Sequence, residues 1–235
     1  MKPLSSEDIS QRLASIQESL TPSARLVAVS KFHPASYVEM AYEAGQRIFG
    51  ESRVQELVDK WERLRESYPD IVWHFIGPLQ TNKVKYLAPF IHISMIESVT
   101  SERLLLEICR QAQRVGRTIP ILLEVHVAEE ETKSGFTPDE IRALVTRIHD
   151  EPDLYRGVAL HGLMAMASHV EDEAKISEEF ASVRRLFEEL RASGLLLSPE
   201  LFTELSMGMS GDYLLALREG ATLIRIGSAI FGDRA

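Results

Sequence analysis

The chain alternates short apolar runs rich in β-branched residues with longer amphipathic stretches, and this alternation strongly limits the folds it can adopt. An amphipathic stretch between two apolar runs predicts a strand-helix-strand unit, with parallel strands and a right-handed crossover. The predicted strands are residues 26–30, 47–50, 72–77, 90–97, 119–127, 157–166, 201–207 and 223–231. Connecting helices are predicted at 35–44, 53–66, 80–87, 100–115, 138–149, 172–193 and 211–219, and an additional helix at 5–20 precedes the first strand.

Residues typical of helix ends support two of these helices. Thr100 is the expected N-cap of the helix at 100–115, and Gly116 ends it. Thr137 is the expected cap of the helix at 138–149, with Pro138 at the first helical position. The amphipathic stretches are therefore predicted to be helices with one buried face.

Eight parallel strands with helices outside them predict a (β/α)8 barrel, a fold of about 250 residues. The chain has 235 residues and no linker rich in Pro, Gly or Ser, so we predict a single barrel domain over residues 1–235. The alternative is an open doubly wound sheet, in which a glycine-rich turn follows the first strand. Here residues 30–34 read SKFHP, without a glycine, and we expect the barrel.

The composition excludes several classes of protein. Because 26 Lys and Arg face 35 Asp and Glu, the net charge is −9, which disfavours nonspecific binding to nucleic acid or anionic membranes. The single cysteine, Cys109, cannot form an internal disulfide, and no apolar run approaches the roughly 20 residues of a membrane span. The N-terminus lacks a secretion signal. We expect a soluble cytoplasmic protein, and the seven histidines show no metal-binding motif.

Lys31 is the first candidate site residue, because the active site of such a barrel lies at the C-terminal ends of its strands. Val27, Val29 and Lys31 share one face of the first strand. If the valines face the barrel interior, Lys31 projects into the mouth of the barrel. Partial desolvation there favours the neutral amine, which attacks aldehydes. The alternative is an ordinary solvated lysine at a strand end.

The segments that follow the last two strands form a candidate oxyanion site. Residues 205–212 read LSMGMSGD and residues 225–228 read RIGS. Such turns offer backbone amides and hydroxyls to a phosphate, and barrels often bind phosphate after strands seven and eight. Arg225 needs an acceptor, since a buried unpaired charge costs several kcal/mol. That acceptor is either a carboxylate, such as Glu204 or Glu124, or a heteroaromatic nitrogen of a ligand.

An aldehyde-reactive lysine, an oxyanion site and a cationic donor match the three functional groups of pyridoxal 5'-phosphate (PLP). PLP carries an aldehyde, a phosphate and a pyridine nitrogen. Aldolases that form Schiff bases on barrels also combine a lysine with phosphate recognition. These residue types alone therefore leave both kinds of protein open.

Six sequence motifs distinguish between these two kinds of protein. They are VSK at 29–31, FGESRVQE at 49–56, WHFIGPLQTNK at 73–83, GLMAM at 162–166, LSMGMSGD at 205–212 and IRIGSAIFG at 224–232. With these motifs, over about residues 25–232, the chain resembles the family of pyridoxal phosphate homeostasis proteins. The resemblance implies a barrel like the N-terminal domain of alanine racemase, with PLP bound to Lys31 as an imine. It also implies that Arg225 faces the pyridine nitrogen and that Ser206, Gly227 and Ser228 hold the phosphate.

Four residues of the motifs have no assigned role. Ser52 stands where the family usually has asparagine, so a contact of Ser52 with the ring is open. His74 is interpreted as a buried core histidine and Asn82 as a helix-start residue, while Met164 either fills the core or packs against a ring.

The resemblance implies a PLP-binding protein of intracellular vitamin B6 homeostasis. We expect no catalytic turnover, because an arginine opposite the ring nitrogen disfavours the protonation that makes PLP an electron sink. The alternative is an enzyme like alanine racemase, which needs a second acid or base opposite the lysine. None of the six tyrosines is indicated for that role, and no second domain is predicted. A pure interaction module would leave Lys31 unreactive. We expect a monomer with PLP-dependent apoenzymes as candidate partners.

Overall fold

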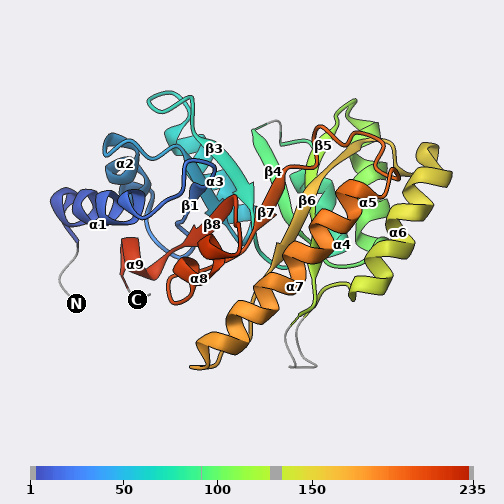
Figure 1. Cartoon of the computed structure of the whole chain (residues 1–235). Coiled ribbons are helices and arrows are strands. Elements are labelled where there is room, and N and C mark those ends of the chain that lie inside the picture. Colours follow the sequence, from blue (N-terminus) through green and yellow to red (C-terminus); the bar gives the residue numbers. More distant parts are fainter. Residues whose placement is uncertain (1–3, 91, 128–133, 233–235) are drawn as a thin grey trace.

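The computed structural model describes residues 4–90, 92–127 and 134–232, and in them eight parallel strands pair in sequence order into a closed barrel (Figure 1). Pairing of the first strand with the last, from Arg25 opposite Leu223 to Ala28 opposite Ile226, closes the barrel as predicted. The strands are β1 Arg25–Val29, β2 Ile48–Glu51, β3 Val72–Phe75, β4 Ile93–Val99, β5 Ile119–Val125, β6 Val158–Ala165, β7 Glu204–Ser206 and β8 Leu223–Ile226.

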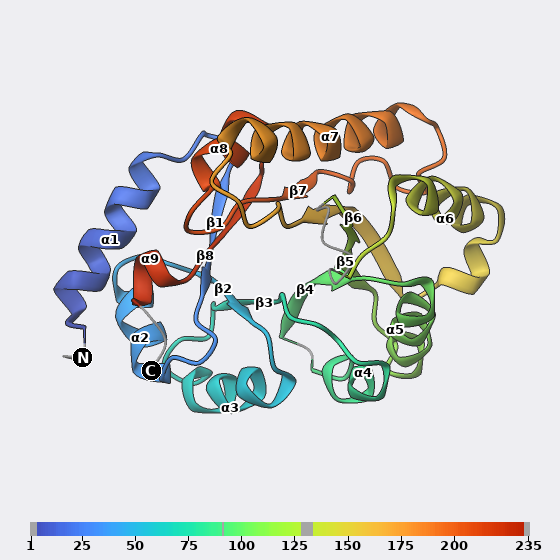
Figure 2. The same cartoon turned by 90° about the horizontal axis from the view of Figure 1, so that it is seen from below.

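Helices surround the barrel on its outside (Figure 2). They are α1 Ser6–Glu18, α2 Ala35–Glu43, α3 Val54–Leu64, α4 Thr81–Leu87, α5 Glu102–Arg114, α6 Pro138–Asp150, α7 Glu173–Ala192, α8 Tyr213–Arg218 and α9 Ser228–Phe231, with the 3-10 helix η1 Pro152–Tyr155. The predicted additional helix, α1, packs against α2 and α9, where Arg12 donates to the carbonyl of Ile230 at 3.2 Å. Among the helices in the described ranges, none has the length and apolar composition to cross a membrane.

The boundaries of three predicted strands need correction. The last strand ends at Ile226 rather than at residue 231, because the amides of Ile230 and Phe231 turn back to the carbonyl of Gly227 and form α9. The predicted strand 201–207 shortens to β7, Glu204–Ser206. The predicted strand 90–97 becomes β4, Ile93–Val99, and residue 91 lies outside the described residues.

The cap of α5 also differs from the prediction. The hydroxyl of Ser101, not that of Thr100, accepts the amide of Leu104 at 3.3 Å. The other predicted cap is confirmed, since Thr137 and Glu140 form a reciprocal capping box and Pro138 is the first helical residue. Caps of this kind stabilise a helix by about 1 kcal/mol.

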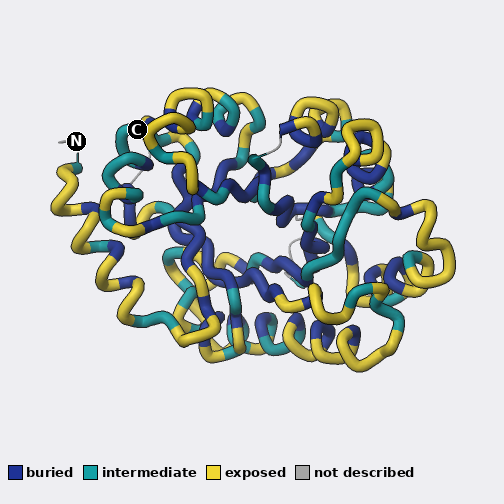
Figure 3. The backbone as a smooth tube through the Cα atoms, turned by 90° about the horizontal axis from the view of Figure 1, so that it is seen from above, coloured by how far each residue is buried: buried dark blue, intermediate teal, exposed yellow. Residues whose placement is uncertain are grey.

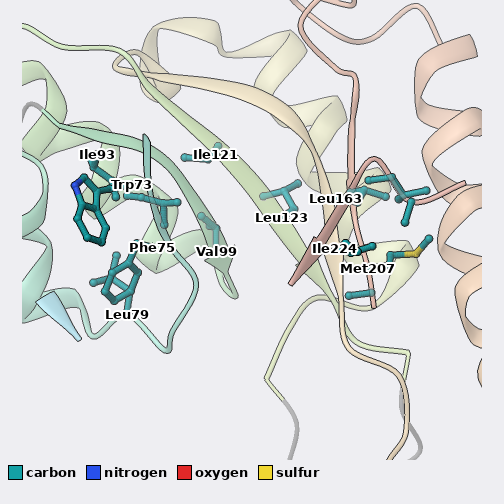
Figure 4. Packing of buried hydrophobic residues seen from close by; sticks show 14 of the residues in the cluster. Trp73, Phe75, Leu79, Ile93, Val99, Ile121, Leu123, Leu163, Met207 and Ile224 are labelled. Carbon is teal, nitrogen blue, oxygen red and sulfur yellow. The ribbon is translucent and has the colours of Figure 1, made fainter. Parts of the chain in front are cut away.

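Buried apolar side chains form an inner and an outer layer. The inner cluster takes Val27, Met95, Leu122, Met164 and Leu223 from five different strands, so these residues fill the barrel interior. The outer cluster packs the other strand faces against the helices; Figure 4 shows part of it, and Figure 3 shows burial concentrated along the strands. Each fully buried side chain contributes about 1.5–3 kcal/mol.

Candidate functional site

Lys31 lies at the mouth of the barrel, on the predicted face of the first strand. Val27 belongs to the inner cluster, and Val29 and Lys31 line a cavity of about 500 Å³ beyond it. The other walls come from β8 and from segments that follow β3, β6, β7 and β8, so the cavity lies at the C-terminal ends of the strands, as predicted. Its volume is typical of small-molecule sites, which span about 300–1,000 Å³.

The structure brings four of the five predicted site residues together. Arg225, Gly227 and Ser228 line the same cavity as Lys31, although Lys31 follows the first strand and the other three belong to the last strand and its end. Gly227 allows close approach of these two chain segments, because a Cβ at this position would lie 3.2 Å from the carbonyl oxygen of Val29.

Ser206 is the exception, because it is fully buried and is not among the residues that line the cavity. Its hydroxyl donates to Glu97 Oε2 at 2.6 Å and accepts from Arg225 Nη1 at 2.6 Å. On the same loop, the hydroxyl residue that lines the cavity is Ser210. The contact of Ser206 with phosphate therefore stays a prediction, and Ser210 joins the candidates.

Arg225 is buried and is held by backbone and side-chain oxygens. Its Nη1 donates to the Ser206 carbonyl at 2.8 Å and its Nη2 to the Ala165 carbonyl at 2.9 Å. Burial lowers the pKa of Arg225, and the negative charges of Glu97, Glu124 and Asp212 oppose this shift.

The carboxylate nearest to Arg225 differs from the two that the sequence suggested. Glu97 Oε2 lies 3.9 Å from Arg225 Nη1. Glu204 instead pairs with Arg25, and Glu124 accepts the hydroxyl of Ser134 at 3.2 Å.

Glu97 is a functional candidate that the sequence pattern did not identify beyond its place near a strand end. It is fully buried, and its Oε1 lies 2.6 Å from Nδ1 of His74. Burial alone would raise the pKa of Glu97, but the hydrogen bond and charge of His74, the charge of Arg225 and the Ser206 hydroxyl hold it below its usual value. In the sequence, the one sign of this role is that Glu97 is a charged residue within the largely apolar β4.

A second group of buried charged residues, Glu51 and Lys60, contacts Ser30, the residue before Lys31. Glu51 Oε1 accepts the Ser30 hydroxyl at 2.6 Å and pairs with Lys60 Nζ at 2.6 Å. Burial raises the pKa of Glu51 to about 7, although Lys60 and Ser30 act in the opposite direction. The sequence signal for Lys60 was a charge on the apolar face of α3, between the buried Leu57 and Leu64.

None of the four unassigned residues lines the cavity that contains Lys31. His74 is buried against Glu97, which agrees with its interpretation as a core histidine. Asn82 is exposed at the second position of α4, which agrees with a helix-start residue, and Met164 fills the barrel interior.

Ser52 lines a different cavity, of about 670 Å³, between α3 and α4. That cavity is larger, but neither Lys31 nor Arg225 lines it. The smaller cavity is lined by both Lys31 and Arg225, so we take it as the candidate site.

The donor set of this site fits PLP. Lys31, Arg225, Ser210 and Ser228 all line the cavity, and their side chains have the chemistry to hold an aldehyde, a ring nitrogen and a phosphate respectively: an amine, a cationic donor and two hydroxyls. The carboxylate in the lining, Asp212, is occupied in part, since its Oδ1 accepts the amide of Met209 at 2.6 Å. Within the ranges that the structure describes, no group of three or more His, Cys, Asp or Glu is arranged to hold a metal ion.

Comparison with known proteins identifies relatives over nearly the whole chain. Residues 4–235 match the family model described as alanine racemase, N-terminal domain. The pyridoxal phosphate homeostasis protein of Pasteurella multocida (strain Pm70) is 34% identical over 236 residues, which cover 96% of this chain and 97% of that protein.

Solved structures show the same fold. PipY of Synechococcus elongatus PCC7942, solved without PLP, superposes with a TM-score of 0.85 at 40% identity, covering 95% of this chain and 100% of PipY. PipY solved with PLP bound gives a TM-score of 0.83 at 38% identity. Alanine racemase from Bartonella henselae, with covalently bound pyridoxal phosphate, shares the fold at 15% identity and a TM-score of 0.73; the match covers 98% of this chain and 60% of that enzyme.

Proposed function

The chain belongs to the family of pyridoxal phosphate homeostasis proteins and carries the alanine racemase N-terminal domain, and from this premise we propose that it binds PLP reversibly without catalytic turnover. The observation that supports the site is that Lys31 and Arg225 line one cavity at the barrel mouth. A PLP-bound structure of the relative PipY supports the ligand.

Each residue has a distinct part in this proposal. The neutral amine of Lys31 would hold the aldehyde of PLP covalently, with the loss of one water. Arg225 would donate to the pyridine nitrogen and would disfavour its protonation. Gly227 and Ser228, with Ser206 and Ser210, are the candidates for the phosphate. Bound PLP supplies a conjugated ring that withdraws electrons.

The cavity lining supports binding over racemisation. An enzyme like alanine racemase needs an acid or base opposite the lysine, and no tyrosine stands among the described residues that line the cavity. His33, His169 and Asp212 line it and are the acid or base groups that a catalytic alternative would use. His33 packs against the rings of Tyr37 and Phe231, with centroids at 5.7 and 5.5 Å.

Borohydride reduction tests the ligand and its attachment. Trypsin cannot cleave after a modified lysine, so the reduced adduct should appear in one peptide, Leu26–Arg47, instead of in two peptides divided after Lys31. The Lys31→Ala variant should lose both the adduct and the visible absorption. If PLP-treated protein yields no reducible adduct at Lys31, the proposal is wrong.

Turnover is tested by exchange of the α-proton of L- or D-alanine in deuterated water. We expect no exchange above that of free PLP or of Lys31→Ala. Exchange that depends on Lys31 would support the catalytic alternative, and the variants His33→Asn, His169→Asn and Asp212→Asn would then identify the second group.

The physiological part of the proposal is delivery of PLP to apoenzymes inside the cytoplasm, with the protein acting as a monomer. Transfer is measured in two arrangements. In one, the PLP-loaded protein and a PLP-dependent apoenzyme are separated by a dialysis membrane, and in the other they share one solution. Faster activation in direct contact than across the membrane would indicate docking, and equal rates would indicate simple release of PLP.

A further inference from the structure

Helix α3 holds the backbone on both sides of Lys31. Lys60 Nζ donates to the carbonyl oxygen of Ser30 at 2.7 Å. Glu56 Oε1 accepts the amide of Phe32 at 2.6 Å. The residue before the candidate lysine and the residue after it are thus both bound by side chains from one helix, which lies outside the barrel next to α2 and α4 (Figure 2).

Lys60 is buried, with a side chain only 6% exposed, although it carries a charge. Its ammonium has three acceptors within hydrogen-bond distance: the Ser30 carbonyl at 2.7 Å, Glu51 Oε1 at 2.6 Å and Glu56 Oε1 at 2.9 Å. An ammonium has three protons to donate, so this geometry satisfies it completely. Lys60 therefore connects both carboxylates to the chain next to Lys31.

The backbone directly after Lys31 adopts an unfavourable conformation. Phe32 has φ of 66°, in the left-handed region that side chains with a Cβ rarely occupy. Such a conformation persists where surrounding contacts hold it. Here the Phe32 amide is bound by Glu56, and the Arg53 guanidinium lies 4.7 Å from the centre of the Phe32 ring.

We propose that Lys60 is a positioning residue for Lys31: by joining the Ser30 carbonyl to Glu51 and Glu56, it fixes the Ser30–Phe32 backbone and thereby the direction of the Lys31 amine. Lys60 is not among the residues that line the cavity, so it acts through the backbone and not on the ligand. This inference rests on the proposed binding of PLP to Lys31.

Two ligands separate a positioning effect from a general defect. PLP carries the aldehyde that reacts with Lys31, whereas pyridoxine 5'-phosphate carries an alcohol there and binds through its ring and phosphate alone. The dissociation constant of pyridoxine 5'-phosphate divided by that of PLP therefore reports how much the bond to Lys31 contributes to binding. A variant that misdirects Lys31 lowers this ratio, while a variant that damages the barrel weakens both ligands together.

The test compares Lys60→Met with Arg63→Met. Both remove a cation from α3, but the Arg63 side chain is 63% exposed and its nearest carboxylate, Glu39, is 3.6 Å away. We expect Lys60→Met to lower the preference for PLP about tenfold or more, the loss of a hydrogen bond to a charged group, with little change for pyridoxine 5'-phosphate. Arg63→Met should keep the wild-type ratio.

An unchanged preference in Lys60→Met overturns the inference, and so does an equal loss of both ligands. If Lys60→Met fails to fold, Glu56→Gln decides the question, because its side chain is 20% exposed and an amide still fits there. We expect the same ratio to fall about threefold in this variant. An unchanged ratio would overturn the inference. A wild-type protein that forms no adduct at Lys31 overturns the proposed function, which the Lys60 variants alone do not.

Discussion

One guanidinium nitrogen of Arg225 donates to two oxygens of Ser206, the backbone carbonyl at 2.8 Å and the hydroxyl at 2.6 Å. The same hydroxyl donates to Glu97, whose other oxygen contacts His74. A continuous set of polar contacts therefore runs from the cavity lining to β3 on another part of the barrel wall. These contacts orient the Arg225 guanidinium.

Replacing Arg225 with Met should destabilise the fold by about 3–5 kcal/mol, because Glu97 would stay buried without the guanidinium. The measurement is the free energy of unfolding in urea. Arg142→Met is the matched control, since it removes exposed ion pairs with Glu189 and Asp139 and should cost about 0–1 kcal/mol. Similar losses in the two variants would contradict this prediction.

Glu97 should make the fold sensitive to acid. Its pKa in the folded chain lies below the usual value, so its ionised form stabilises the fold above the unfolded pKa, near 4.3. That contribution is lost as the pH falls from there through the lower folded pKa. Glu97→Gln should be less stable near neutrality but should lose less stability on acidification, as measured by urea unfolding between pH 7 and pH 3. Parallel curves would refute the assignment.

Cys109 should be unreactive in the folded protein. Burial raises the pKa of its thiol to about 12, against about 8.5 for a free cysteine. The protonated thiol contributes stability below the unfolded pKa, and this contribution is lost as the pH rises through the folded value. Because Cys109 is the single cysteine, a thiol reagent at pH 8 should label the chain only with denaturant present. Rapid labelling of the native protein would be inconsistent with this burial.

Gly208 and Gly211 should respond differently to alanine, although they lie in the same turn. Gly208 has φ of 90°, and a Cβ there would lie 2.7 Å from the Cβ of Ala216. Gly211 has no atom within 4 Å of such a Cβ. We expect Gly208→Ala to cost at least about 1–3 kcal/mol in urea unfolding, and Gly211→Ala less than about 1 kcal/mol. The reverse order would show that the turn is built differently.

The pattern of the sequence predicted the barrel and the position of Lys31 at its mouth because both depend on local periodicity. The alternation of strands and helices required parallel pairing, and period two placed Lys31 beyond Val27 and Val29. Periodicity did not decide which face of the last strand points inward, and the structure shows that Arg225 shares its face with Leu223 of the inner cluster.

The networks behind these two residues could not be read from the chain in the same way. Ser206 and Glu97 are 109 residues apart, and Lys60 lies 30 residues from Ser30, so their contacts depend on the closed three-dimensional arrangement. The end of the last strand was also missed, because Ile224, Ile226, Ile230 and Phe231 are all apolar and buried whether in a strand or in α9.

Closure of the barrel between β1 and β8 has a consequence for synthesis on the ribosome. Lys31 and Arg225 are 225 − 31 = 194 residues apart in the sequence. A chain that grows by about 5–20 residues per second therefore needs roughly 10–40 s to extend from one to the other. During that interval the nascent chain carries its lysine but not the wall that faces it. Capture of an aldehyde ligand in the cavity is therefore a property that the nascent chain gains only with its last strand.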